Sequence, residues 1–226
     1  MTMQSESVAA VLRRIEIAAR TAGRDPGSVR LVAVSKQQQA LAIRNVALTG
    51  QRDFGESYTQ EALPKIESLR DLKLTWHFIG RLQGNKTRDV AEQFDWVHTV
   101  DRARIADRLN EQRPASLLPL NVCIQVQVTP EPQKAGIPPE EVEPLARYIM
   151  TLPRLKLRGL MCIPPATDPK AVQQDFAALA ALARDLRNLD IDCDTLSMGM
   201  SGDFEAAIAA GSTVVRVGTA IFGERH

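Results

Sequence analysis

A lysine directly follows an apolar, strand-like run near the start of the chain. Residues 31–35 read LVAVS and continue into Lys36 with no turn signal between them. In one interpretation Lys36 is a surface lysine whose aliphatic stem covers apolar side chains. In the other, partial burial lowers the pKa of the amine and favours its neutral form, which condenses with carbonyl compounds. The chain has 7 lysines against 21 arginines, and this choice of an amine favours Schiff-base chemistry on Lys36.

Two turns of small residues near the carboxyl end are candidates for anion binding. The run 196–202 ends in glycine and serine, with Ser201 or Gly202 where the next helix is expected to start. The first N–H groups of a helix have no partner within it and stabilise anions. Alternatively, Ser201 only caps its own helix. The last apolar run ends in a second such turn, Gly218-Thr219, and the two turns together predict a phosphate site.

An arginine lies next to the second turn. In a strand, Arg216 and Gly218 share a face, so Arg216 is predicted to point inward. A buried guanidinium keeps its charge and needs an acceptor. That acceptor is either a ligand or a carboxylate, for which Glu56 and Asp203 are candidates.

An imine-forming lysine, a phosphate site and an inward arginine together describe a binding site for pyridoxal 5′-phosphate (PLP). The aldehyde would bond Lys36, and the phosphate would lie on Ser201, Gly218 and Thr219. Arg216 would then face the pyridine nitrogen.

These residues require a scaffold that brings distant strand ends together. Strands are predicted at 31–35, 52–55, 75–80, 96–100, 121–128, 155–161, 192–198 and 213–218, and helices from Ser5 to about Gly23 and at 102–112, 140–150 and 171–189. This alternation predicts one α/β domain over residues 1–226, a (β/α)₈ TIM barrel with an extra N-terminal helix. The open doubly wound sheet is the alternative. We expect the first helix to fill the gap left after the eighth strand, where the sequence stops.

Composition limits the class of protein. A formal net charge of +1 predicts no general attraction to nucleic acid or to a membrane surface. No segment approaches the length of a membrane span. Three cysteines, Cys123, Cys162 and Cys193, indicate reduced thiols and a cytoplasmic protein. Neither they nor the histidines have metal-ligand spacing, so no metal is predicted.

Two further side chains are candidates for contact with the ring. His77, within WHFIG, could approach the cofactor, although a histidine bonded inside the barrel is the favoured interpretation. Met200 could pack on the ring or simply fill space.

The sequence resembles the pyridoxal phosphate homeostasis proteins (the YggS/PROSC family), single-barrel relatives of the alanine racemase N-terminal domain. The resemblance runs from Val8 to Arg225 and rests on AVSK (33–36), FGE (54–56), QEALPKI (60–66), WHFIG (76–80), LQGNK (82–86), GLM (159–161), LSMGMS (196–201) and RVGTAIFG (216–223). It implies a PLP-binding barrel with Lys36 as the Schiff-base lysine. It also implies phosphate contacts from Ser201, Gly218 and Thr219, and Arg216 beside the ring nitrogen.

The sequence departs from the family pattern at the rim. Ser57 replaces an asparagine that would lie near the cofactor and is kept as a cofactor-binding candidate. Arg81, Gly84 and Gln127 also differ from the pattern, and we expect rim contacts to differ there.

Turnover of amino acids on PLP needs an electron sink and groups that move the α-proton. An arginine at the ring nitrogen does not protonate it readily, and only Tyr58 and Tyr148 are available as tyrosine bases. We therefore expect a monomeric PLP carrier for vitamin B6 homeostasis, with apo-enzymes as possible recipients and no catalytic residue. The alternatives are a low-activity PLP-dependent racemase or lyase, and a cofactor-free Schiff-base aldolase.

Overall fold

Eight parallel strands close into a barrel in the computed structural model, which describes residues 3–131, 135–165 and 168–223. The strands are β1 (Arg30–Val34), β2 (Asp53–Glu56), β3 (Thr75–Phe78), β4 (Trp96–Val100), β5 (Leu120–Gln125), β6 (Leu155–Met161), β7 (Thr195–Ser197) and β8 (Val214–Val217). They follow one another around the ring in chain order, and β8 pairs with β1. The predicted barrel is confirmed, and the open sheet is excluded.

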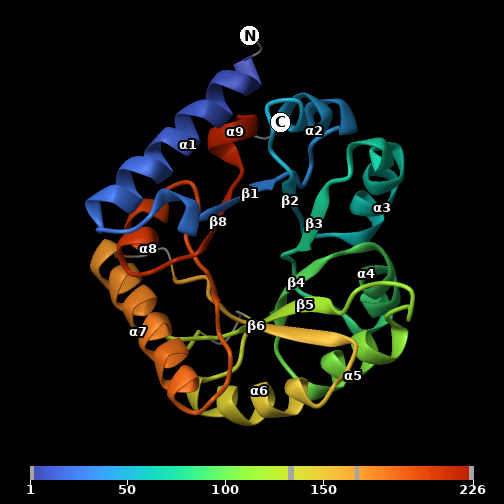
Figure 1. Ribbon diagram of the computed structural model, residues 1–226, viewed down its shortest axis with the longest axis vertical. Helices are drawn as coiled ribbons and strands as arrows, with labels where there is room; N and C mark the ends of the chain where they lie inside the picture. Colours follow the sequence, from blue (N-terminus) through green and yellow to red (C-terminus); the bar gives the residue numbers. More distant parts are fainter. Residues whose placement is uncertain (1–2, 132–134, 166–167, 224–226) are drawn as a thin grey trace.

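Helices surround the strands (Figure 1). They are α1 (Met3–Thr21), α2 (Ala40–Ala47), α3 (Thr59–Ser68), α4 (Thr87–Gln93), α5 (Ala103–Gln112), α6 (Val142–Met150), α7 (Pro169–Asn188), α8 (Phe204–Ala209) and α9 (Thr219–Phe222). Two strands are shorter than the sequence predicted. Residues 126–128 of the predicted strand 121–128 and residues 192–194 of the predicted strand 192–198 lie outside β5 and β7.

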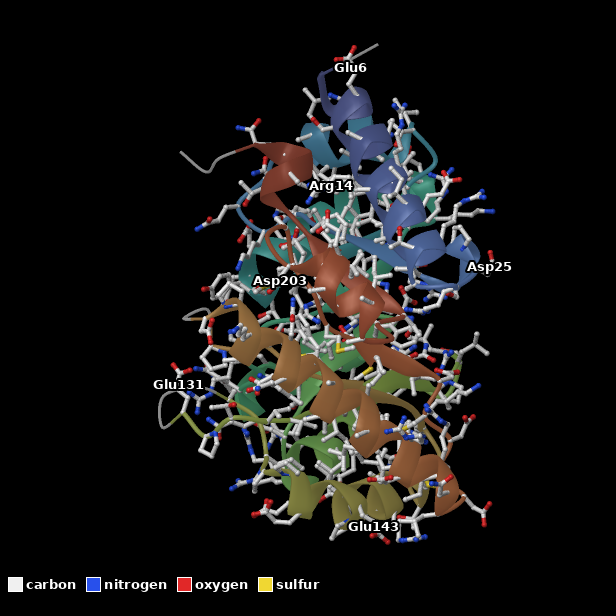
Figure 2. All side chains as sticks on the ribbon, turned by 90° about the vertical axis from the view of Figure 1, so that its left-hand side faces the viewer. Glu6, Arg14, Asp25, Glu131, Glu143 and Asp203 are labelled. Carbon is white, nitrogen blue, oxygen red and sulfur yellow. The ribbon has the colours of Figure 1, made fainter. Side chains whose placement is uncertain are left out.

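The N-terminal helix completes the outer ring. Val8, Val11 and Ile15 of α1 are buried, and α1 packs against α8, α9 and α2 (Figure 1). Arg14 of α1 binds Glu205 of α8 at 2.6 Å; Figure 2 shows Arg14 between these helices. The helix after β8, α9, has only four residues, so α1 covers the position that a full eighth helix would take, as predicted.

The carboxyl ends of the strands meet at one end of the barrel, the mouth. Figure 2 shows Asp203 and Glu131, which follow β7 and β5, on one side of the molecule, and Asp25, which precedes β1, on the other. Side chains of one parity in each strand point into the barrel. Lys36, Ser57 and Arg216 therefore converge on the mouth although they are far apart in the sequence.

Candidate functional site

One cavity of about 260 Å³ at the mouth is lined by all of the predicted cofactor-binding residues except His77. Its lining includes Lys36, Ser57, Met200, Ser201, Arg216, Gly218 and Thr219. Apolar walls come from Val34, Ile79 and Ile163. The cavity therefore combines an amine, a guanidinium and two small-residue turns around an apolar slot.

The backbone on both sides of Lys36 is fixed. Ser35 Oγ donates to Glu56 Oε1 at 2.6 Å. Gln37 has a positive φ of 64°, and its N–H donates to the carboxylate of Glu61. The half-buried Lys36 side chain thus starts from a rigid turn at the cavity edge.

A buried ion cluster lies behind that turn, between the barrel and α3. Lys65 Nζ lies 2.9 Å from Glu56 Oε1 and 2.6 Å from Glu61 Oε1, and it donates to the Ser35 carbonyl at 3.0 Å. Sequence reasoning did not assign this role to Lys65. The only signal was the four-residue spacing of Glu61 and Lys65 on a helix.

Glu56 depends on this lysine. Its side chain is fully buried, and burial raises the pKa of Glu56, an effect opposed by the Lys65 charge and the Ser35 hydrogen bond. Its second oxygen, Oε2, has no hydrogen-bond partner within the described part of the chain. Removing the lysine would leave a buried carboxylate without a counter-ion.

Arg216 is buried, with 4% of its surface exposed. Its Nη1 donates to the Ser197 carbonyl and hydroxyl, both at 2.7 Å, and its Nη2 donates to the Cys162 carbonyl at 3.0 Å. The carboxylate partners considered from the sequence are not found: no ion pair joins Arg216 to Glu56 or Asp203 in the described residues. One N–H on Nη2 and the N–H on Nε likewise have no partner there, and they remain available beside the cavity.

A chain of hydrogen bonds runs from Arg216 into the barrel. Ser197 Oγ lies 2.7 Å from His98 Nδ1. His98 Nε2 lies 2.9 Å from His77 Nδ1, and His77 Nε2 lies 2.9 Å from Asp53 Oδ1. Because the arginine can only donate and the carboxylate can only accept, both histidines must carry their proton on Nε2. His77 therefore lies beneath the cavity as a structural link, the interpretation favoured from the sequence.

The barrel interior favours the neutral form of both imidazoles. Burial lowers the pKa of His77, partly opposed by Asp53. Burial, with the nearby His77 and Arg216, lowers the pKa of His98 well below its ordinary value. The chain of hydrogen bonds therefore has the guanidinium of Arg216 at one end and the carboxylate of Asp53 at the other.

The two small-residue turns form one edge of the cavity. A Cβ on Gly218 would lie 3.2 Å from the Val34 carbonyl oxygen, so the absence of a side chain lets β8 end close to β1. In α9 the N–H groups of Ile221 and Phe222 donate to the Gly218 carbonyl, whereas those of Thr219 and Ala220 have no partner within the helix. Two expectations for Ser201 are wrong. The next helix does not start at Ser201 or Gly202, and Ser201 does not cap it, because α8 starts at Phe204 with Asp203 as its N-cap residue.

The cysteines show no sign of a reactive site. Cys123, Cys162 and Cys193 are free and buried, and burial raises the pKa of Cys162 to about 12 and of Cys193 to about 11, so these thiols stay protonated. In the described ranges no group of histidine, cysteine and acidic side chains has the geometry of a metal site. None of the described helices is both long and apolar enough to cross a bilayer.

Comparison with known proteins identifies relatives across nearly the whole chain. Residues 7–226 match the family described as alanine racemase, N-terminal domain. The pyridoxal phosphate homeostasis protein of Pseudomonas aeruginosa is 55% identical over 225 residues, which cover 100% of this chain and 97% of the relative. The protein of the same name from Escherichia coli is 51% identical, covering 98% of this chain and 96% of the relative.

Solved structures also match this chain over nearly its whole length. PipY of Synechococcus elongatus, determined with PLP bound, matches with a TM-score of 0.86 and 37% identity, over 98% of this chain and 100% of that chain. Alanine racemase from Corynebacterium glutamicum matches with a TM-score of 0.67 and 17% identity, over 96% of this chain and 61% of that chain. The second match shows a shared barrel fold.

Replacing Lys65 by methionine is expected to lower the free energy of unfolding by about 3–5 kcal/mol, because Glu56 would remain buried and unpaired. Urea unfolding at pH 7 measures the change. Lys170→Met, at an exposed position on α7, is the matched control and should change stability by less than about 0.5 kcal/mol. Equal effects in the two variants would show that the cluster contributes nothing.

Stability should fall in mild acid because of the buried histidines. Their pKa values are held below the ordinary 6.5, so just below pH 6.5 the unfolded chain binds protons that the folded barrel does not. The stabilising contribution is complete above that pH and is lost as the pH falls, by up to about 1.4 kcal/mol per pH unit for each histidine. Urea unfolding at pH 6.5 and 5.5 should show about half this slope in His98→Asn; an unchanged slope would contradict the assignment.

Proposed function

The chain belongs to the pyridoxal phosphate homeostasis protein family, within the wider family of alanine racemase N-terminal domains, and we propose that it binds PLP at the barrel mouth and serves vitamin B6 homeostasis. When bound, PLP supplies an aldehyde that condenses with amines. In this proposal Lys36 holds the aldehyde as a Schiff base. Ser201, Gly218 and Thr219 hold the phosphate, and Arg216 faces the ring nitrogen.

The observation that carries the proposal is the convergence of three different groups on one cavity. Lys36 comes from the end of β1, Arg216 from β8, and Ser201 from the turn after β7. Arg216 lines the cavity with N–H groups that have no partner among the described residues. The pyridine nitrogen is an acceptor that would pair with one of them, while the apolar walls would cover the ring.

The solvent exposure of the turns fits a reversible carrier. Thr219 is exposed and Ser201 and Gly218 are half-buried, so a phosphate there would stay in contact with water. Ser57 and Met200 line the same cavity and would contact the ring. Transfer of PLP to apo-enzymes, the monomeric state and the cytoplasmic location remain predictions from the sequence.

The positions of the two tyrosines, the possible bases, support reversible binding of PLP rather than catalytic turnover of amino acids. Tyr148 lies in the outer ring, where its hydroxyl donates to Asp107 of α5 at 2.5 Å. Tyr58 is at the rim with 59% of its surface exposed. A racemase needs proton-moving groups on both faces of its substrate, and a guanidinium at the ring nitrogen makes the ring a weak electron sink. We therefore propose that the protein performs no robust catalysis.

PLP added to the protein should give a visible absorption band that disappears in Lys36→Ala, because the ε-amine is the group that condenses. Borohydride reduction followed by peptide mapping should place one pyridoxyl group on the peptide that contains Lys36. Lys170→Ala is the control and should retain both the band and the label.

Two results would overturn the proposal. A label of equal yield on Lys36→Ala would place the Schiff base elsewhere. Rapid loss of α-deuterium from amino acids incubated with the PLP-loaded protein would favour the racemase alternative.

A further inference from the structure

A second cavity, which we call the amine pocket, opens beside Lys36. It has a volume of about 400 Å³ and shares Lys36, Ser57 and Ile79 with the proposed cofactor cavity. Its other walls are mostly polar and include Tyr58, Thr59, Gln60, Arg81, Gln83 and Lys86. A molecule in this pocket would therefore meet Lys36 from the side away from the phosphate turns.

The charge of the amine pocket is unbalanced. Besides the Schiff-base candidate Lys36, its described lining includes two cations, Arg81 and Lys86, and no carboxylate. Neither the Arg81 nor the Lys86 side chain makes a hydrogen bond or ion pair with another described residue. By contrast, the nearby Arg102 is paired with Asp101 at 2.5 Å. Cations brought together in a concave site attract anions.

Arg81 lies on a backbone segment that is fixed by its neighbours. A Cβ on Gly80 would lie 2.1 Å from the Ser57 carbonyl oxygen, so the backbone before Arg81 rests directly on the end of β2. Thr99 Oγ1 holds the Gly80 carbonyl at 2.6 Å, and Leu82 is buried. Arg81 therefore projects from a point fixed on both sides.

Lys86 is positioned independently. It ends the short 3₁₀ turn Gly84–Lys86, and its N–H donates to the Gln83 carbonyl at 3.0 Å. Thr87 Oγ1 donates to the Gly84 carbonyl at 2.9 Å. The backbone positions of both cations are thus fixed before any ligand enters, which lowers part of the entropic cost of binding.

We propose that the amine pocket binds the carboxylate of an α-amino acid through Arg81 and Lys86, so that the amino acid's own amine takes PLP from Lys36. The proposal rests on the proposed function, because it needs the Schiff base on Lys36. The ligand class follows from two requirements. An amine is the group that exchanges with a Schiff base, and the charges of Arg81 and Lys86, with no carboxylate in the described lining, favour an anion on the same molecule.

The exchange balances without an oxidant or reductant. The incoming nitrogen forms a bond to the carbon that Lys36 holds, and the bond between that carbon and Lys36 Nζ breaks. The Schiff base is protonated before and after the exchange, so one proton passes from the incoming neutral amine to Lys36 Nζ, which leaves as a neutral primary amine. Unloading of the cofactor would then respond to amino acids more than to simple amines.

The test compares two amines on the PLP-loaded protein. L-alanine carries a carboxylate and ethylamine does not, and each is added over a concentration range expressed as free base. After borohydride reduction, the fraction of pyridoxyl group on Lys36 and the fraction on the small molecule are measured by mass spectrometry. The readout is the concentration that transfers half of the label.

Arg81→Ala is expected to raise the half-transfer concentration of L-alanine about tenfold, the size expected for one lost hydrogen bond to a charged group. Lys86→Ala should act in the same direction. Ethylamine should show no such shift in either variant. Arg88→Ala, an exposed cation on α4 paired with Glu92, is the matched control and should leave both amines unchanged.

Equal shifts for both amines in Arg81→Ala and Lys86→Ala, or no shift for either, would overturn the amine pocket. Failure of the proposed function is distinguishable from this result, because no pyridoxyl group would then be found on Lys36 in the samples without amine. Arg81→Lys keeps the positive charge. If its half-transfer concentration for L-alanine equals that of the unchanged protein, recognition by charge is supported.

Discussion

A guanidinium buried inside a barrel must be given acceptors, since it cannot lose its proton. Arg216 finds them in Ser197 and in the Cys162 carbonyl. Ser197 in turn continues through His98 and His77 toward Asp53. A continuous chain of hydrogen bonds therefore crosses a barrel interior that also contains Trp96, on which His77 stacks. These hydrogen bonds hold Arg216 in one orientation. They leave one N–H on Nη2 and the N–H on Nε for a ligand.

The amine of the site is positioned from outside the barrel. Lys36 projects into the mouth, whereas the residues that fix its backbone, Ser35, Glu56 and Lys65, lie between the strands and α3. Ion pairs in such buried places stabilise little in net terms, because desolvation offsets the attraction. We interpret the cluster as a device for positioning the turn. A rigid starting point matters for a lysine that must form and release a covalent bond.

The sequence predicted the barrel because each strand is a short apolar run between helical segments. It also predicted which residues would share the mouth, since Lys36, Ser201, Arg216 and Gly218 all stand at strand ends. It did not predict the partners of Arg216. Ser197 and His98 are 99 positions apart, and only the closed ring brings them together. The sequence did not predict the role of Lys65. Glu56 lies on β2 and Lys65 on α3, and their contact is visible only once the helix packs against the strand.

The central claim is that the cavity between β1 and β8 holds PLP with its aldehyde on Lys36. A crystal structure of the protein soaked in PLP tests this most directly. We expect density that continues from Lys36 Nζ into the cofactor, with the phosphate within hydrogen-bond distance of Ser201, Gly218 and Thr219. Density for the phosphate at any other place, or a mouth that contains only solvent at saturating PLP, would contradict the account.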